Sequence, residues 1–286
     1  MPHRAEPGYF AFKSWPIRVI GLVLLACASP IILLLVLIVR ATSRGPGLYR
    51  QTRTGKDGQE FQMYKVRTMY QDAESVSGPT WCKPGDSRIT PIGRILRLLH
   101  LDELPQLINI VRGEMDLVGP RPERPSFVEM LAREIPAYRD RLQVLPGVTG
   151  LAQVNLPPDE TLDCVRRKLV LDCDYIQSAN LGLDLRILVC TSLRMLGIRH
   201  GRAVRMFYLE RQVTLPTDSA TTPAPRSGNR DRVAAGRRSE PAYATIQATN
   251  DKAPQVRPDV DLEDFYASYD EPEAVAAIAQ ATRRPR

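Results

Sequence analysis

Two adjacent carboxylates, Asp102 and Glu103, are the residues with the clearest potential for chemistry in this chain. Pro105 follows them closely, and because a helix tolerates proline only in its first turn, we expect a helix to begin near the pair. Both carboxylates would then lie beside the partial positive charge of a helix N-terminus, which keeps an Asp ionised and can hold a phosphate close to it. The alternative interpretation is an N-cap and a first-turn acid that only stabilise the helix.

The pair must be positioned by an amphipathic helix. Apolar residues at positions i, i+3, i+4 and i+7 define one face: Leu104, Leu107, Ile108 and Val111. Polar residues and a glycine follow the same spacing on another face: Asp102, Gln106, Asn109 and Gly113. A glycine turn and the rigid segment Gly119–Pro122 then follow, so that 22 residues, 101–122, combine acids, helix, turn and a basic Gly-Pro-Arg-Pro motif.

Basic residues that could accompany these acids lie in two neighbouring elements and in the motif itself. Alternation along a strand over 61–69 places Lys65 and Arg67 on one face. Arg94 and Arg97 form an i, i+3 pair on a short helix that the N-cap signal Thr90-Pro91 introduces. These side chains and Arg121 are candidates to hold phosphate oxygens. Solvated strand charges and ordinary salt bridges are the alternatives.

The remaining patterns predict an α+β fold that is mostly helical, with a small β-hairpin and amphipathic surface helices. The hairpin strands are expected at 48–52 and 61–69, around a Gly-containing turn. Residues 71–88 are expected to be a surface loop. Residues 145–153, which include Gln153, are expected to be a Gly/Pro-braced turn leading into a short extended segment. Further helices are predicted at 125–138, 161–177 and 181–195.

Residues 19–39 form a run without charge, long enough to span a bilayer, and too long for a signal peptide. Ser29 and Pro30 lie in its middle, where Pro must kink the helix. The residues alone leave two topologies open: one kinked spanning helix, or a re-entrant helix-break-helix that enters and leaves the same leaflet. Basic residues lie on both sides of the run, Arg18 before it and Arg40 and Arg44 after it. They favour a cytoplasmic location of both ends, and therefore the re-entrant topology.

Composition bounds the partners and the domains. The net charge of +7 suits a nucleic acid, an anionic membrane surface or a phosphorylated substrate. The five cysteines lack metal-ligand spacing and are expected to be reduced thiols. We divide the chain into a membrane anchor (1–44), a catalytic domain (45–212) and a mostly disordered tail (213–286), in which 273–281 could form a weak helix.

The motifs, taken together, resemble the bacterial sugar transferase family, the monotopic polyprenyl-phosphate phosphoglycosyl transferases. The resemblance rests on the apolar segment with central Ser29-Pro30 and on four further stretches, in the family's order: YKVRTM at 64–69, SRITPIGRILR at 87–97, LDELPQLINIVRGEMDLVGPRP at 101–122 and LPGVTGLAQV at 145–154. These span roughly residues 15–200. His100 and Asp116 depart from the pattern, which usually has a small hydroxyl residue and Ser there.

The resemblance implies transfer of a sugar-1-phosphate from a UDP-sugar to undecaprenyl phosphate, with release of UMP, as the initiating step of exopolysaccharide, capsule, O-antigen or glycoprotein glycan synthesis. It implies Asp102 as nucleophile, forming an aspartyl-phosphosugar, and Glu103 as its partner, with both carboxylates near Mg²⁺. Gln153 is a candidate for substrate positioning. The implied location is the bacterial inner membrane with a cytoplasmic catalytic domain, which favours the re-entrant topology. The implied form is the short one, with an added tail that could bind protein partners.

Two other function classes compete with the enzyme. A membrane-anchored, non-catalytic scaffold of a glycan assembly complex would need no intact Asp102-Glu103 pair, and the absence of UMP release would favour it. A basic nucleic-acid-binding module on a membrane anchor lacks a recognisable binding fold, so we expect no nucleic acid among the partners.

Overall fold

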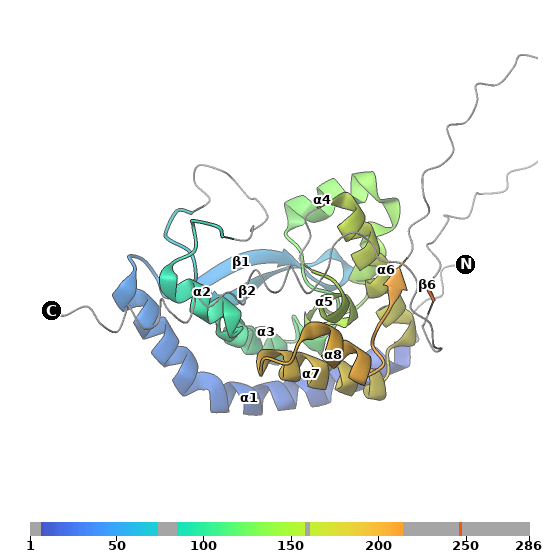
Figure 1. Ribbon diagram of the computed structural model, residues 1–286, viewed down its shortest axis with the longest axis horizontal. Helices are drawn as coiled ribbons and strands as arrows, with labels where there is room; N and C mark the ends of the chain where they lie inside the picture. The colour runs from blue at the N-terminus through green and yellow to red at the C-terminus, as the bar shows by residue number, and fades with distance from the viewer. Residues whose placement is uncertain (1–6, 74–84, 158–160, 214–245, 248–286) are drawn as a thin grey trace, which may run out of the picture.

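The computed structural model describes residues 7–73, 85–157, 161–213 and 246–247. Within them, one long helix, α1 (Pro7–Thr42), carries the apolar N-terminal run and is long and apolar enough to cross a membrane. It stays helical through Pro16 and Pro30 and bends midway (Figure 1). The expected helix-break-helix is therefore a single bent helix, because a proline removes one backbone hydrogen bond while the turns around it remain intact.

Only one side of α1 packs on the rest of the protein. Its inner face contributes Ile17, Leu35 and Val39 to two hydrophobic clusters. Much of its remaining apolar surface is exposed: Phe12, Trp15, Val19, Ile20, Leu22, Val23, Leu24, Ile31, Leu33, Leu34, Leu37 and Ile38. An apolar surface of this extent is typical of a membrane or protein contact site.

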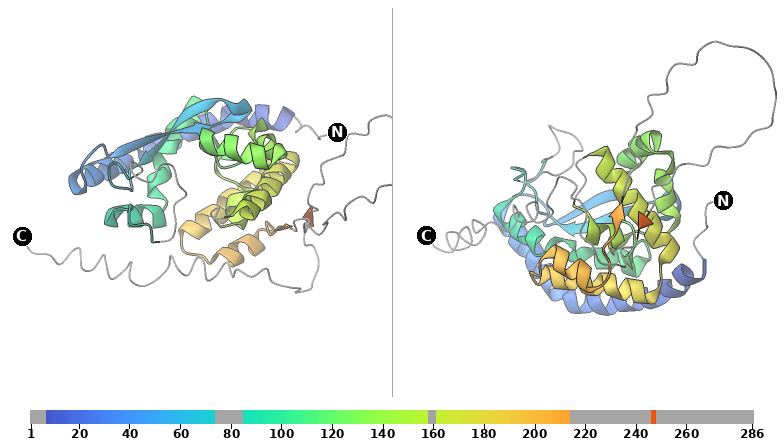
Figure 2. Two further views of the ribbon diagram at one scale, coloured as in Figure 1. Left: turned by 90° about the horizontal axis from the view of Figure 1, so that it is seen from above. Right: turned by 45° about the vertical axis from the view of Figure 1, so that its right-hand side comes forward.

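Both ends of α1 contact the same folded domain. Near the start, the Lys13 ammonium lies 3.0 Å from the Asp184 carboxylate. Just past the end, the Arg67 guanidinium donates to the Ser43 carbonyl at 2.9 Å and to the Arg44 carbonyl. Figures 1 and 2 show that α1 extends along the length of the domain between these attachments.

The predicted hairpin is confirmed. Strand β1 (Leu48–Thr54) pairs antiparallel with β2 (Glu60–Val66) across the 3₁₀ turn η1 (Lys56–Gly58). β2 ends three residues earlier than predicted, although the Arg67 amide still donates to the Gly47 carbonyl at 2.8 Å, next to the start of β1. Lys65 and Arg67, predicted on one face, have different partners: Lys65 contacts Glu103, whereas Arg67 donates to the Ser43 carbonyl.

The helix that carries the acidic pair differs from its prediction. Residues 101–106 form a 3₁₀ helix, η2 (Leu101–Gln106), and the α-helix α3 (Leu107–Arg112) begins only after it. His100 precedes η2 in the left-handed region, with φ 52°. Pro105 lies inside η2, where its missing amide is compatible with a short, tight helix.

The predicted apolar face of this helix is only half-buried, whereas Asn109, on the predicted polar face, is fully buried. The Asn109 side chain accepts from the Tyr64 amide at 3.1 Å and donates to the Gln62 carbonyl at 2.7 Å. Asn109 thus extends the hydrogen bonding of β2 onto α3, so a polar side chain holds the helix against the hairpin. The helical period does not reveal this arrangement, because α3 has neighbours on two sides.

The other helices agree closely with the sequence. Helix α2 (Pro91–Leu98) begins where predicted, and the Thr90 hydroxyl accepts from the Gly93 amide at 2.9 Å. Helix α6 (Leu162–Ser178) and helix α7 (Leu181–Met195) match their predictions within one residue. The segment predicted at 125–138 is divided into α4 (Pro125–Glu134) and the 3₁₀ helix η3 (Pro136–Gln143), because Pro136 lacks an amide. Helix α8 (His200–Met206) was not predicted.

Two short strands bring together the segments around residues 116–122 and 145–153. Strand β3 (Asp116–Val118) pairs in parallel with β4 (Gly147–Thr149), and helix α5 (Leu151–Asn155) follows directly. The prediction of an extended segment through Gln153 is therefore correct only to Thr149. The main hydrophobic cluster surrounds these elements, with Leu151, Ile187 and Leu209 fully buried.

Little of the predicted tail lies within the described residues. Strand β5 (Gln212–Val213) pairs antiparallel with β6 (Ile246–Gln247), so three residues of the stretch predicted to be disordered, Val213, Ile246 and Gln247, are paired. The predicted weak helix at 273–281 and most of the loop at 71–88 lie outside the described residues. The described cysteines, Cys27, Cys164, Cys173 and Cys190, are free thiols, as predicted.

Candidate active site

Asp102 lies at the start of η2 with its side chain buried, at 6% relative exposure. Among the described residues, no hydrogen bond or ion pair engages its carboxylate. Burial raises the pKa of Asp102, and the charge of Glu103 raises it further, while Lys65 and Arg97 oppose the shift. An unengaged, poorly hydrated carboxylate is a stronger nucleophile than a solvated one.

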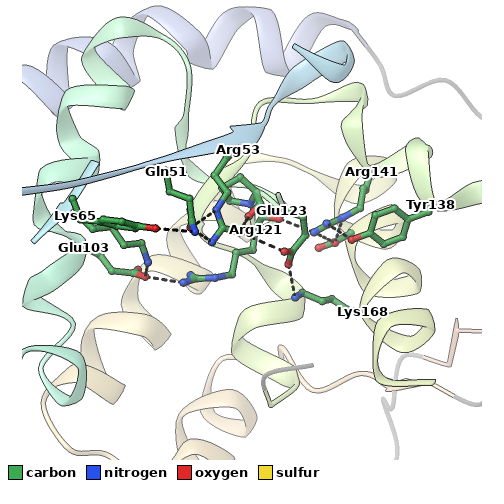
Figure 3. Close-up of polar contacts among 12 residues, drawn as sticks. Gln51, Arg53, Lys65, Glu103, Arg121, Glu123, Tyr138, Arg141 and Lys168 are labelled. Atoms are coloured by element: carbon green, nitrogen blue, oxygen red, sulfur yellow. Dashed lines mark hydrogen bonds and ion pairs between the residues drawn. The ribbon is translucent and has the colours of Figure 1, made fainter. Parts of the chain in front are cut away.

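Glu103, the next residue, has the opposite electrostatic environment. Its Oε1 accepts from the Lys65 ammonium at 2.6 Å and from the Arg121 guanidinium at 2.7 Å (Figure 3). Burial alone would raise the pKa of Glu103, but Arg121 and Lys65 outweigh it and hold that pKa well below its usual range. Glu103 is therefore ionised, and Oε2 has no hydrogen-bond partner among the described residues.

The four charges of this cluster come from three segments of the chain. Lys65 comes from β2, the acids from η2, and Arg121 from the segment that follows β3. Two cations face two carboxylates, so the cluster has no net negative charge to repel a diphosphate. Burial lowers the pKa of Lys65, and the charge of Glu103 opposes that shift. The Glu103 carboxylate therefore stabilises the charged form of Lys65.

The segment that delivers Arg121 is held by close backbone packing. The Gly119 amide donates to the Thr149 carbonyl at 2.9 Å, and the Gly147 amide donates to the Pro120 carbonyl at 2.9 Å. A Cβ on Gly119 would lie 2.5 Å from the Leu145 carbonyl oxygen, so only glycine fits there. The motifs at 101–122 and 145–154 are therefore joined directly by backbone hydrogen bonds.

The other predicted phosphate-binding residues lie in different surroundings. Arg97 belongs near the site, because its charge acts on Asp102, and its Nε donates to the Thr68 hydroxyl at 2.9 Å. Arg94 is exposed on α2. Arg67 holds the backbone that follows α1, away from Glu103. Gln153 donates to the Val148 carbonyl at 2.9 Å, while its buried Oε1 has no hydrogen-bond partner in the part of the chain that the structure describes.

Sequence reasoning missed three polar residues around this cluster. Arg194 on α7 donates to the Gln153 carbonyl at 3.1 Å, although α7 was predicted only as an apolar helix. Arg53 on β1 donates to the Pro122 carbonyl at 2.9 Å, and burial lowers its pKa to about 10. Glu123 pairs with Arg53 at 3.4 Å and with Lys168 at 3.6 Å. The Glu directly after Gly-Pro-Arg-Pro was the one signal available.

The sequence that contains these motifs matches the model of a known protein family. The model of the family described as "Bacterial sugar transferase" matches residues 10–197, which is more than half of the chain and includes every residue of the charged cluster. The chain belongs to the bacterial sugar transferase family.

Relatives of this sugar transferase have names that specify donor and acceptor. It is 44% identical over 172 residues to a UDP-glucose:undecaprenyl-phosphate glucose-1-phosphate transferase of Caulobacter vibrioides, covering 59% of this chain and 63% of the relative. It is 40% identical to a UDP-N-acetylgalactosamine-undecaprenyl-phosphate N-acetylgalactosaminephosphotransferase of Aeromonas hydrophila, covering 57% of this chain and 38% of the relative. The chain thus spans less than two thirds of the length of either protein.

A shorter relative is covered more completely. The sugar transferase is 42% identical to a putative undecaprenyl-phosphate N-acetylgalactosaminyl 1-phosphate transferase of Bacillus subtilis, over 47% of this chain and 74% of the relative. The names of these relatives include both glucose and N-acetylgalactosamine.

The positions of Asp102 and Glu103 in the sugar transferase restrict which metal ion they could bind. Among residues 7–73, 85–157, 161–213 and 246–247, no group of three or more His, Cys, Asp or Glu side chains could hold a metal ion. Mg²⁺ is commonly bound by one or two carboxylates together with substrate phosphates. Asp102 and the unpartnered Oε2 of Glu103 fit that donor set, whereas they do not fit a metal that needs an all-protein cage.

Proposed function

We propose that the protein transfers a sugar-1-phosphate from a UDP-sugar to undecaprenyl phosphate through a covalent intermediate on Asp102. What supports the proposal is the buried, unengaged carboxylate of Asp102 beside a Glu103 that two cations hold ionised, in a chain of the bacterial sugar transferase family.

In the first step, a carboxylate oxygen of Asp102 attacks the phosphorus that carries the sugar. A P–O bond forms to Asp102 while the bond to the bridging oxygen breaks, and UMP leaves with that electron pair. In the second step, a phosphate oxygen of undecaprenyl phosphate attacks the same phosphorus. The product is an undecaprenyl diphosphate sugar, and Asp102 is regenerated as a carboxylate.

The cations around the acids would stabilise charge that develops on the phosphoryl oxygens. Lys65 and Arg121 already lie against Glu103, and Arg97 lies close enough to influence Asp102. Because these groups are partly buried, their charges are less screened than they would be in water. They would neutralise the leaving phosphate and orient the diphosphate for displacement by Asp102.

Asp102 and Glu103 are the residues that would hold Mg²⁺, which supplies charge neutralisation to the leaving phosphate when it is bound. The acceptor is a lipid phosphate, so the reaction belongs at a membrane surface. The exposed apolar face of α1 would anchor the domain in the inner membrane, with the active site at the cytoplasmic headgroup level.

The test is release of UMP by detergent-solubilised protein with Mg²⁺, undecaprenyl phosphate, and either UDP-glucose or UDP-N-acetylgalactosamine. We expect release with one donor, and its loss in Asp102→Asn, which keeps the size of the side chain but removes its charge. Incubation with labelled donor and no acceptor should leave a phosphosugar attached to the wild-type protein and none on the variant.

Asp163→Asn is the matched control, because the Asp163 side chain is 65% exposed and lies on α6. It should release UMP at the wild-type rate. Release that survives in Asp102→Asn would exclude Asp102 as the nucleophile. Absence of release with every donor would favour the scaffold function instead.

A further inference from the structure

A buried arginine outside the charged cluster holds the backbone of Arg121. Arg141, on η3, is 2% exposed, and its Nη2 donates to the Arg121 carbonyl at 2.8 Å. Figure 3 shows Arg141 on the opposite side of Arg121 from Glu103. The side chain of Arg121 is 38% exposed, so its direction depends largely on how its backbone is held.

Arg141 is itself fixed by two further partners. Its Nε donates to the Asp172 carboxylate at 2.8 Å, and its Nη2 lies 2.7 Å from the same oxygen. Its Nη1 donates to the Tyr138 hydroxyl at 2.9 Å. Asp172 is also 2% exposed and belongs to α6. Because all three nitrogens of this buried guanidinium have hydrogen-bond partners, the Arg141 side chain is held in one conformation.

This connection links the core to the reaction centre in three contacts. Asp172 holds Arg141, Arg141 holds the Arg121 carbonyl, and the Arg121 side chain contacts Glu103 at 2.7 Å. Apart from these three contacts, the described contacts that hold residues 119–121 are backbone hydrogen bonds of Gly119 and Pro120. Those bonds do not restrain the Arg121 carbonyl.

We propose that Arg141, fixed by Asp172, is a positioning residue that aims Arg121 at Glu103. Among the described contacts it does not reach Asp102 or Glu103, and it acts through the backbone of Arg121. The competing view is that Arg141 and Asp172 are only a buried ion pair that joins η3 to α6. The two views differ in what happens to the side chain of Arg121 when the pair is removed.

The test removes the pair without leaving one buried charge alone, which would be strongly destabilising. The double variant Arg141→Met/Asp172→Leu is combined with Arg121→Met, which deletes the Arg121 side chain but keeps its carbonyl. Melting temperatures (Tm) of the four full-length proteins in detergent then report whether the two changes act on one interaction.

If Arg141 positions Arg121, the Arg121→Met change lowers Tm by less than half as much in the double-variant background as in wild type. Equal Tm shifts in both backgrounds would overturn the proposal, whatever happens to activity. This measurement needs no substrate, so it still decides the proposal if the proposed function fails. Arg141→Lys, which keeps the buried charge but cannot reach all three partners, is the variant to use if the double variant does not fold, and it has the same criterion.

The second readout is UMP release, which depends on the proposed function. We expect it to fall about 10-fold or more in Arg141→Met/Asp172→Leu, because small misplacement of a binding group has effects of this size. The matched control is Arg211→Met/Asp174→Leu, which removes an α6 ion pair with an N–O distance of 3.1 Å that does not touch residues 119–121. Release equal to this control would overturn the role of Arg141 in the reaction.

Discussion

At the scale of single residues, two neighbouring acids differ because of their neighbours. Glu103 contacts two cations, and its pKa lies well below the usual range, whereas burial raises the pKa of Asp102. Glu103 therefore contributes stability that is lost only as pH falls through its low folded-state pKa. Asp102 does the reverse: because burial raises its pKa, its carboxyl group costs stability at neutral pH.

We expect Asp102→Asn to raise Tm at pH 7.5 even as it abolishes UMP release. The folded-state pKa of Asp102 is higher than its unfolded-state pKa, so the penalty is present at neutral pH, begins to decrease as pH falls through the folded-state pKa, and is gone below the unfolded-state pKa. Each pKa unit corresponds to about 1.4 kcal/mol, and each 1 kcal/mol shifts Tm by about 2–4 °C for a domain of this size. Thermal denaturation of both proteins between pH 4 and 8 measures the difference.

The exposed Asp163→Asn variant is the control and should leave Tm within about 2 °C of wild type. A Tm for Asp102→Asn below that of wild type at neutral pH would show that the ionised carboxylate stabilises the fold. The environment of Asp102 would then be more polar than the described contacts indicate.

At the scale of elements, the acidic pair depends on how closely α1 and α3 approach. Gly21 of α1 faces Ile110 of α3, and a Cβ there would lie 2.7 Å from the Ile110 Cγ2. Ile110 is fully buried, so it has little room to move. α3 continues directly from η2, and a displaced α3 would therefore move Asp102 and Glu103.

We expect Gly21→Leu to destabilise the protein by about 1–3 kcal/mol, because the added side chain overpacks the contact between α1 and α3. Thermal denaturation in detergent checks the stability. The same substitution at Gly8, where a Cβ would meet nothing within 4 Å, is the control and should leave Tm unchanged or slightly raised. Equal losses in the two variants would mean that the effect comes from the membrane helix itself and not from its contact with α3.

At the scale of the whole molecule, the path of α1 limits its topology. Lys13 near its start and Ser43 just past its end are both attached to one domain. A helix that crossed the bilayer fully would have to separate these attachments by a hydrocarbon layer of about 30 Å. The bend in α1 and its exposed outer face instead suit a helix that dips into one leaflet.

We expect cysteines placed at Gly8 and Arg44, both exposed, to be labelled from the same side of sealed vesicles by a membrane-impermeant maleimide. The background protein would have its own cysteines replaced by alanine. A cysteine at Leu33, which is 60% exposed on the apolar face, should be protected by lipid. Labelling of Gly8→Cys and Arg44→Cys from opposite sides would establish a spanning helix and require the contacts at one end of α1 to open.

Local patterns in the sequence were sufficient to predict the helices with clear boundaries, the hairpin, the adjacent acids and the family. Thr90-Pro91 marks the start of α2, and the apolar pattern gives α7 its exact bounds, because capping and periodicity are local properties. Lys65, Asp102, Glu103 and Arg121 were also available from motifs, since each lies inside a short, specific stretch of residues.

Only the tertiary structure decided which of the candidate cations meet the acids. Lys65 and Arg121 converge on Glu103, whereas Arg67 donates to the backbone just past the end of α1. Arg141 and Asp172 carried no signal at all, since a buried ion pair is made by residues far apart in the chain. Long-range packing creates these contacts, and no local pattern of residue types encodes them.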